Sequence, residues 1–226
     1  MKNQTNLLLT AALLSLGANA FAQSAGSWSA SVGVTHMAPL VDSGNLTSIP
    51  LHGTLPNTQV DVNSNTQLTG AVNYMVTDHL ALHLPLGTGF KHEISGAGAI
   101  AGVGKLIDAK ALPITLIAQY RFMEANAVFR PYLGAGVSYV KFYKEKGTAL
   151  LTALTNPGGA ATGVSFESKL APTFQLGAVF NLNEKWFLDA SYAKTLLKTR
   201  ATLTTGQTID VKLNPNSYTL QVGYKF

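Results

Sequence analysis

The sequence PNSYTLQVGYKF, residues Pro215–Phe226, decides the fold class because two kinds of side chain alternate along it. Large apolar and aromatic residues, such as Leu220 and Phe226, occupy every second position, and small or polar residues, such as Gln221, occupy the others. A β-strand sends successive side chains to opposite faces, so this segment has one apolar face and one polar face. The pattern is typical of the last strand of a barrel that faces lipid outside and a wetter space inside.

The other end of the chain indicates export. A short positive region begins at Met1–Lys2, and the apolar run Leu7–Leu16 is too short to cross ~30 Å of hydrocarbon as a helix. Ala20-Phe21-Ala22 is an A-x-A cleavage site. We therefore predict a secretory signal peptide over residues 1–22, removed on export, and a barrel domain over residues 23–226. An uncleaved anchor is the alternative.

The composition agrees with a membrane barrel. Hydrophobic residues make up 46% of the 226 residues and charged residues only 12%, compared with ~25% in ordinary soluble domains. No later apolar run is long enough for a spanning helix, so the apolar residues are spread over alternate positions. The lack of cysteine excludes thiol nucleophiles and cysteine-based metal sites. The net charge of +5 carries no nucleic-acid signature, because basic and aromatic residues are not interleaved on one face.

The alternation recurs about eight times, and short connections alternate with long ones. The predicted strands are Trp28–Met37, Thr66–Val76, Leu80–Leu86, Leu112–Phe122, Arg130–Tyr143, Lys169–Asn181, a strand that begins at Trp186, and Pro215–Phe226. The short connections are 77–79, 123–129 and 181–185, and the long ones are 38–65, 91–111, 144–168 and 200–211. We predict an all-β fold: an eight-stranded antiparallel transmembrane β-barrel with short periplasmic turns and long extracellular loops.

A soluble eight-stranded barrel is the structural alternative, because it also alternates apolar and polar residues. It would have to bury the apolar face, but here that face carries aromatic residues at the strand ends, as in a membrane-interface girdle. The opposite face consists of Gly, Ser, Thr, Gln and Asn, which would make a poor dry core. The two faces therefore favour the membrane barrel.

Four charged residues, Arg121, Arg130, Asp189 and Lys225, have inward parity and lie near the short-turn ends of their strands. The interior of a small eight-stranded barrel is just wide enough for side chains to fill, and buried charges must pair or cost several kcal/mol. We predict that these residues form a polar plug that closes the periplasmic end. The alternative is a structural core with no role in transport.

Several apparent motifs carry no chemistry. Gly96–Lys105 looks like a phosphate-binding loop, but Ala99 stands where that motif requires Gly and Leu106 where it requires Ser or Thr. His79 and His83 are ~13 Å apart on a strand and cannot share a metal. The eleven acidic residues are spread singly, and no Ser/His/Asp set converges. We therefore expect no enzyme activity, no cofactor and no metal site.

The chain resembles the OmpW family of small outer-membrane barrels, which includes the AlkL-type hydrocarbon uptake proteins. The matching segments are Asn65–Leu68, Tyr74–Asp78, Phe90–His92, Leu112–Thr115, Ala118–Phe122, Phe129–Val137 and Gly223–Phe226. The most specific of them is FRPYLGAG, which begins at Phe129. The resemblance implies an eight-stranded barrel in the outer membrane, with a narrow hydrophobic channel that passes small apolar molecules from outside into the membrane.

One departure from the family concerns the wall. Relatives commonly carry a proline just before the phenylalanine that matches Phe90, where it is associated with a wall opening, but this chain has Gly89. Proline cannot donate to a strand ladder, and Pro85 and Pro113 lie on neighbouring predicted strands. We predict a lateral seam at Pro85, Gly89 and Pro113. Pro131 and Pro172 meet the same criterion and leave other seams open.

The long loops are unusually apolar for segments in water, so they can fold over the barrel mouth as a funnel. The family match contributes most to this prediction, and in the alternative the loops pack on one another and bind nothing. The predicted funnel residues are Leu46, Leu51, Leu55, Phe90, His92, Ile94, Leu106, Phe142 and Phe166.

The sequence favours a passive outer-membrane channel for small hydrophobic molecules. The alternative is a structural or adhesive barrel whose loops bind lipopolysaccharide, a host, a phage or a bacteriocin. Expected partners are outer-membrane lipid, lipopolysaccharide phosphates that meet loop lysines, small hydrophobic solutes, and the barrel assembly machinery during insertion. The sequence names neither the solute nor the oligomeric state.

Overall fold

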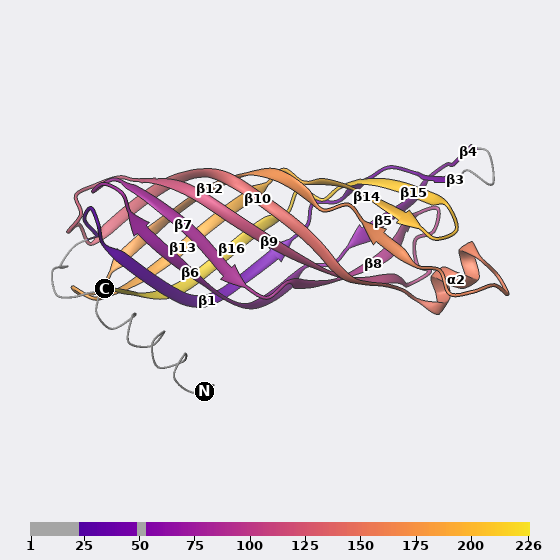
Figure 1. Ribbon diagram of the computed structural model, residues 1–226, viewed down its shortest axis with the longest axis horizontal. Coiled ribbons are helices and arrows are strands. Elements are labelled where there is room, and N and C mark those ends of the chain that lie inside the picture. Colours follow the sequence, from indigo (N-terminus) through magenta and orange to yellow (C-terminus); the bar gives the residue numbers. More distant parts are fainter. Residues whose placement is uncertain (1–22, 49–52) are drawn as a thin grey trace, which may run out of the picture.

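The computed structural model describes residues 23–48 and 53–226, which form an elongated antiparallel barrel (Figure 1). The predicted signal segment 1–22 and Leu51 of the predicted funnel lie outside these residues. The barrel strands are β1 (Trp28–Ala38), β6 (Asn65–Met75), β7 (Leu80–Gly87), β9 (Lys105–Arg121), β10 (Phe129–Gly147), β12 (Lys169–Asn181), β13 (Trp186–Thr195) and β16 (Asn216–Lys225). Within these two ranges, no helix combines the length and the apolar character needed to cross a bilayer.

The first and last barrel strands pair with each other and close the ring. Ala30 on β1 lies opposite Tyr224 on β16, and the same register runs to Ala38 opposite Asn216. Every other neighbouring pair is antiparallel as well, and the β9–β10 pairing completes the circle. The predicted eight-stranded antiparallel barrel is therefore confirmed.

The two faces of the wall agree with the alternation of the sequence. Leu220 is 55% exposed on the outside, whereas its neighbour Gln221 is only 4% exposed and faces the interior. Leu68, Leu116 and Leu176 are likewise more than half exposed. A soluble barrel would not leave its large aliphatic side chains on the outer surface while burying glutamines, so that alternative is wrong.

Aromatic side chains mark the short-turn end of the apolar band. The rings of Trp28 and Tyr74 lie 4.8 Å apart on β1 and β6, and those of Trp186 and Tyr224 lie 5.1 Å apart on β13 and β16. Phe226 continues this row beside Tyr224. The start of β1 and the C-terminus lie together at this end (Figure 1). The girdle sets the depth at which the wall meets the membrane interface.

The regions predicted as long loops are mostly strands that extend the barrel beyond the apolar band. The additional strands are β2 (Asp42–Ser43), β3 (Leu46–Ser48), β4 (Gly53–Leu55), β5 (Thr58–Val62), β8 (Phe90–Gly98), β11 (Val164–Phe166), β14 (Lys198–Leu203) and β15 (Gln207–Lys212). Strands β9 and β10 run to 17 and 19 residues because their pairing continues past the membrane. The extension has its own apolar core around Ile94, Leu106 and Ile107, and the short helix α2 (Ala149–Thr155) packs Leu151 against it.

The third predicted strand corresponds to β7, and β8 follows it after a two-residue break, in the region predicted as a long loop. β7 pairs with β9 only from Leu80 to His83, and β8 resumes the pairing with β9 at Phe90. Among the described residues, the segments 84–89 and 112–116 make no ladder contact with each other. The wall is therefore interrupted between β7 and β9 at the outer part of the apolar band.

Gly223 provides a test of the packing inside the barrel. Its cross-strand partner Phe187 is 1% exposed and lies over it, so a Cβ at position 223 would overlap the aromatic ring. We expect Gly223→Val to lower the free energy of unfolding by about 1–3 kcal/mol through overpacking, as measured by urea unfolding in lipid vesicles. Gly53→Ala is the control, because nothing lies within 4 Å of the added Cβ. Equal stability of the two variants would contradict this packing.

Candidate functional site

The short-turn end of the interior is filled by the four charged residues predicted as a plug. Arg121, Arg130, Asp189 and Lys225 are each at most 6% exposed. Arg121 donates to the side-chain oxygen of Gln23 and, over 3.1 Å, to Oε1 of Gln119. Arg130 donates over 3.1 Å to the backbone carbonyl of Gln23 and also to the carbonyls of Asp78 and Met123. Gln23 therefore joins the two arginines.

The charges are satisfied mainly by neutral oxygens, whereas the sequence predicted pairing between opposite charges. In the part of the chain that the structure describes, no ion pair involves Arg121, Arg130 or Lys225. Lys225 donates to Oδ1 of Asn181 and the carbonyl of Asn183, each over 3.3 Å. Asp189 accepts from the Tyr132 hydroxyl over 2.9 Å, and the Tyr132 ring lies 5.9 Å from the Arg121 guanidinium carbon.

A belt of amides and hydroxyls lies above the charged end. Gln119 donates to Gln175 over 2.8 Å, and His83 bonds Asn73 over 2.6 Å. On one side of the barrel, hydroxyls link Thr115, Ser138, Thr173 and Thr195 from strand to strand at 2.6–2.9 Å. On the other side, Thr35 bonds Thr69 over 2.7 Å and Thr219 over 3.0 Å. These mutual hydrogen bonds satisfy the interior polar groups at this level.

Two cavities lie in the interior. The lower one, of ≈ 100 Å³, lies inside the barrel at the level of this belt, whose threonines and Gln175 line it together with Asp189. It reaches the interrupted wall at Pro85, Thr88, Phe90 and Pro113. The upper one, of ≈ 60 Å³, lies within the extension and is lined almost entirely by apolar side chains. Met37, Pro113 and Thr195 line both cavities, so the two are adjacent and meet at these residues.

The four candidate prolines differ in whether the strand pairing beside them is continuous or interrupted. Pro85 and Pro113 lie on the two edges of the interrupted β7–β9 pairing. Pro131 and Pro172 lie within β10 and β12, whose mutual pairing is continuous from Phe129 opposite Phe180 to Val140 opposite Lys169. The interruption therefore coincides with the first pair of prolines.

Gly89 lies at the long-loop end of the interruption, where it contacts Tyr143. Its backbone N–H donates to the Tyr143 hydroxyl over 3.2 Å, although Tyr143 belongs to β10 and lies opposite Lys110 of β9. A Cβ at position 89 would overlap the Tyr143 ring. A proline at this position would lack the N–H group and collide with the phenol, so glycine is the residue that permits this contact.

The predicted funnel residues separate into three groups. His92, Ile94, Phe142 and Phe166 line the upper cavity, and Phe90 lines the lower one. Leu106 packs with Ile94 in the core of the extension and lines neither cavity. Leu46 and Leu55 face each other across the β3–β4 ladder, and Leu46 packs near Phe166.

His92 is the only one of these funnel residues with an ionisable group, and it is uncharged at neutral pH. Burial lowers the pKa of its imidazole, and only the hydrogen bond to the carbonyl of Asn63 raises that pKa. Nδ1 lies 2.8 Å from this carbonyl, which must accept, so the proton resides on Nδ1 and Nε2 is an acceptor. His92 therefore adds one acceptor nitrogen to a lining in which Thr195 is the other polar side chain.

Several residues of this region could not be predicted as site residues from the alternation along the strands. Gln23 precedes the first predicted strand, and Tyr143 ends its strand with the parity of a lipid-facing residue. Leu197, Leu213 and Pro215 also line the upper cavity, from segments between strands. The described ranges contain no group of three or more metal-ligating side chains, and Gly96–Lys105 forms the hairpin between β8 and β9.

The Gly89–Tyr143 contact predicts a coupled mutational effect. Gly89→Pro should lower the free energy of unfolding by about 1–3 kcal/mol, because it removes the N–H donor and displaces the phenol. In the background of Tyr143→Ala the same change should cost much less, giving a coupling energy of about 1 kcal/mol or more in urea unfolding. Gly87→Ala is a matched control, since its Cβ meets only ordinary contacts. Additive effects would show that the two residues do not interact.

The comparisons with known proteins agree with this architecture. The model of the OmpW family matches residues 24–226. The chain is 38% identical over 178 residues to outer membrane protein W of Vibrio cholerae serotype O1, covering 75% of this chain and 79% of that protein. It is 26% identical over 175 residues to outer membrane protein AlkL of Ectopseudomonas oleovorans, covering 77% and 71%.

Among solved structures, the outer membrane protein OprG from Pseudomonas aeruginosa is similar with a TM-score of 0.83 at 26% identity, over 92% of this chain and 99% of that one. The family match spans nearly the whole described chain, and the barrel and its outer-membrane location agree with the names of the relatives. The chain therefore belongs to the OmpW family and is an outer-membrane β-barrel protein.

Proposed function

We propose that the barrel is a passive route by which small hydrophobic molecules cross from outside into the membrane. A solute would enter the upper cavity, pass Met37 and Pro113 into the lower cavity, and leave between β7 and β9. The observation that carries this proposal is the interrupted ladder, because the lower cavity reaches the wall where 84–89 and 112–116 are unpaired.

The lining of the upper cavity supports an apolar cargo. Ile94, Val140 and Phe142 present aliphatic and aromatic surface, and His92 supplies one acceptor. Small-molecule sites are concave and mostly apolar, with few polar groups that fix orientation. The resemblance to the AlkL-type hydrocarbon uptake proteins favours the same class of solute.

The charged end supports a sideways exit. Arg121, Arg130 and Lys225, held by buried hydrogen bonds, fill the axial path on the periplasmic side. An apolar solute would have to displace these groups and leave their charges unsatisfied, at a cost of several kcal/mol. Passage through the seam leads from the lower cavity to hydrocarbon without displacing any of these three cations, none of which lines that cavity.

A cross-link across the seam tests this route. The chain has no cysteine, so Leu86→Cys/Ile114→Cys introduces one pair. These two residues face outward on the two edges of the interruption. We expect oxidation to lower the uptake of radiolabelled n-octane by cells several-fold and a phosphine reductant to restore it.

The matched control is Leu133→Cys/Leu176→Cys, which joins two outward-facing partners on the continuous β10–β12 ladder. Its oxidation should leave octane uptake unchanged. Full uptake through a quantitatively cross-linked β7–β9 seam would refute the lateral exit. Equal uptake by cells with and without the protein would favour an adhesive or structural barrel instead.

The proposed plug has an independent test. Removing both guanidinium groups in Arg121→Ala/Arg130→Ala should raise ion conductance in planar bilayers, because it empties the axial path. Gln23→Ala keeps the arginines but removes a side-chain oxygen that holds Arg121, so it should raise conductance less. Lys185→Ala, an exposed lysine at the same end, should change nothing. Conductance equal to that of the unchanged protein in the double variant would count against the plug.

A further inference from the structure

We propose that the outer wall directly above the β7–β9 interruption binds the phosphate of a phosphorylated lipid through Lys91, Lys110 and Lys141. The occupant is a lipid of the outer leaflet, whose phosphate lies at the lysines while its acyl chains lie along the apolar wall below them.

The three lysines form one row across neighbouring strands. Lys91 on β8 lies directly opposite Lys110 on β9. Lys110 lies opposite Tyr143 on β10, two residues from Lys141, so these two lysines are diagonal neighbours. All three have the same outward parity as Ile114 and Leu116, which are exposed on the lipid-facing wall.

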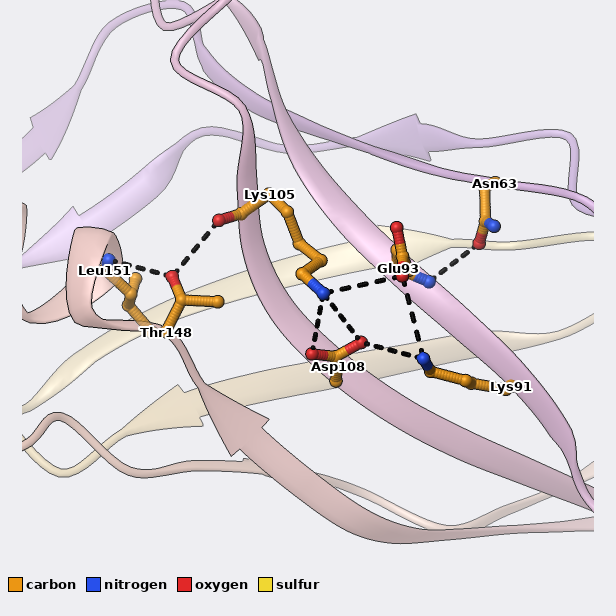
Figure 2. Close-up of polar contacts among 7 residues, drawn as sticks. All are labelled: Asn63, Lys91, Glu93, Lys105, Asp108, Thr148 and Leu151. Carbon is orange, nitrogen blue, oxygen red and sulfur yellow. Dashed lines mark hydrogen bonds and ion pairs between the residues drawn. The ribbon is translucent and has the colours of Figure 1, made fainter.

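The row carries positive charge that the protein does not balance. Figure 2 shows that Lys91 and Lys105 share the carboxylates of Glu93 and Asp108, at nitrogen–oxygen distances of 3.0–3.7 Å. The Glu93 backbone is held by the Asn63 side chain over 2.7 Å, which fixes this pair of carboxylates on the wall. Lys91 and Lys105 thus neutralise both of these carboxylates.

Lys110 and Lys141 are left without a carboxylate. In the two ranges that the structure describes, neither of them takes part in an ion pair. Like charges directly opposite each other on a ladder, such as Lys91 and Lys110, destabilise it. An anion shared by the row would remove this repulsion, which makes the uncompensated lysines complementary to a phosphate.

The depth of the row identifies the phosphate as that of a lipid. Immediately below it the outer wall is apolar: Ile114, Leu116 and Val137 are each more than half exposed. Along β8, β9 and β10 the three lysines are therefore the first cations beyond this apolar stretch, where lipid head groups are expected to begin. Their aliphatic stems can lie along the apolar wall while the ammonium groups reach the interface.

The site adjoins the seam. Tyr143, which lies opposite Lys110 and two residues from Lys141 on β10, reaches Gly89 at the end of the interruption. The acyl chains of a lipid held by the lysines would extend toward the unpaired segments 84–89 and 112–116. Its effect on solute exit rests on the proposed function, whereas its binding depends on the wall alone.

The test measures lipid binding to the detergent-solubilised full chain by native mass spectrometry, with lipid A that carries two phosphates as the probe. Each lysine near a charged lipid surface is worth about one kcal/mol, so we expect Lys110→Gln/Lys141→Gln to weaken binding roughly 10-fold or more. Lipid A stripped of its phosphates should bind the unchanged protein as weakly as the intact lipid binds the variant.

Lys185→Gln/Lys198→Gln is the control, because it removes the same charge from two exposed lysines elsewhere on the chain, neither of which forms an ion pair with a described residue. It should bind lipid A like the unchanged protein. Equal binding by the row variant, or equal binding of the dephosphorylated lipid, would overturn the proposal. Displacement of lipid A by inorganic phosphate at similar concentration would show an anion site with no preference for lipid, which also overturns it. None of these measurements involves transport, so a failed lateral exit leaves them interpretable.

Discussion

In hydrocarbon every backbone N–H and C=O group of the wall needs a partner within the protein, because lipid offers none. That constraint gives the interruption between β7 and β9 its significance. Each unpaired group that faces lipid costs several kcal/mol, so an interrupted ladder must limit the number of such groups. Pro85 and Pro113 lie on the two edges, and since proline carries no N–H, each removes one donor that would otherwise be orphaned. The Gly89–Tyr143 hydrogen bond then satisfies another donor at the margin.

Buried polar groups of the interior also need partners, and most of them have one. At the short-turn end no described carboxylate forms an ion pair with Arg121, Arg130 or Lys225, and amide and carbonyl oxygens from Gln23, Gln119 and Asn181 accept hydrogen bonds from these cations. The Nε atoms of Arg121 and Arg130 have no partner among the described residues. Higher up, threonines and serines satisfy one another across the strands. Above them the lining becomes apolar. Polarity thus falls continuously from the periplasmic end to the extension, which is the gradient that an apolar solute would need in order to enter and not traverse the full axis.

Parity along the strands explains what the sequence could predict. It assigned Leu220 to the outside and Gln221 to the inside, and it located Arg121, Arg130, Asp189 and Lys225 near one end, because a strand's period of two fixes both faces. It could not find Gln23, which precedes the first strand and is positioned only by the closed barrel. It could not choose among Pro85, Pro113, Pro131 and Pro172, since the choice depends on which neighbouring ladder is interrupted. The long connections, predicted as apolar funnel loops, are largely strands in the structure. The sequence could not predict this, because pairing between segments far apart in the chain, such as β3 and β15, leaves no local pattern.

The closure of β1 on β16 also determines how the chain must fold. Ser31 donates to Gln221 across this junction, and the two residues are 190 positions apart. Bringing such distant segments together carries a large cost in loop-closure entropy, so we expect this junction to form late in folding. Until then both terminal strands expose free edges, which invite pairing with other chains. A folding catalyst for this barrel would therefore act by holding the two chain ends together.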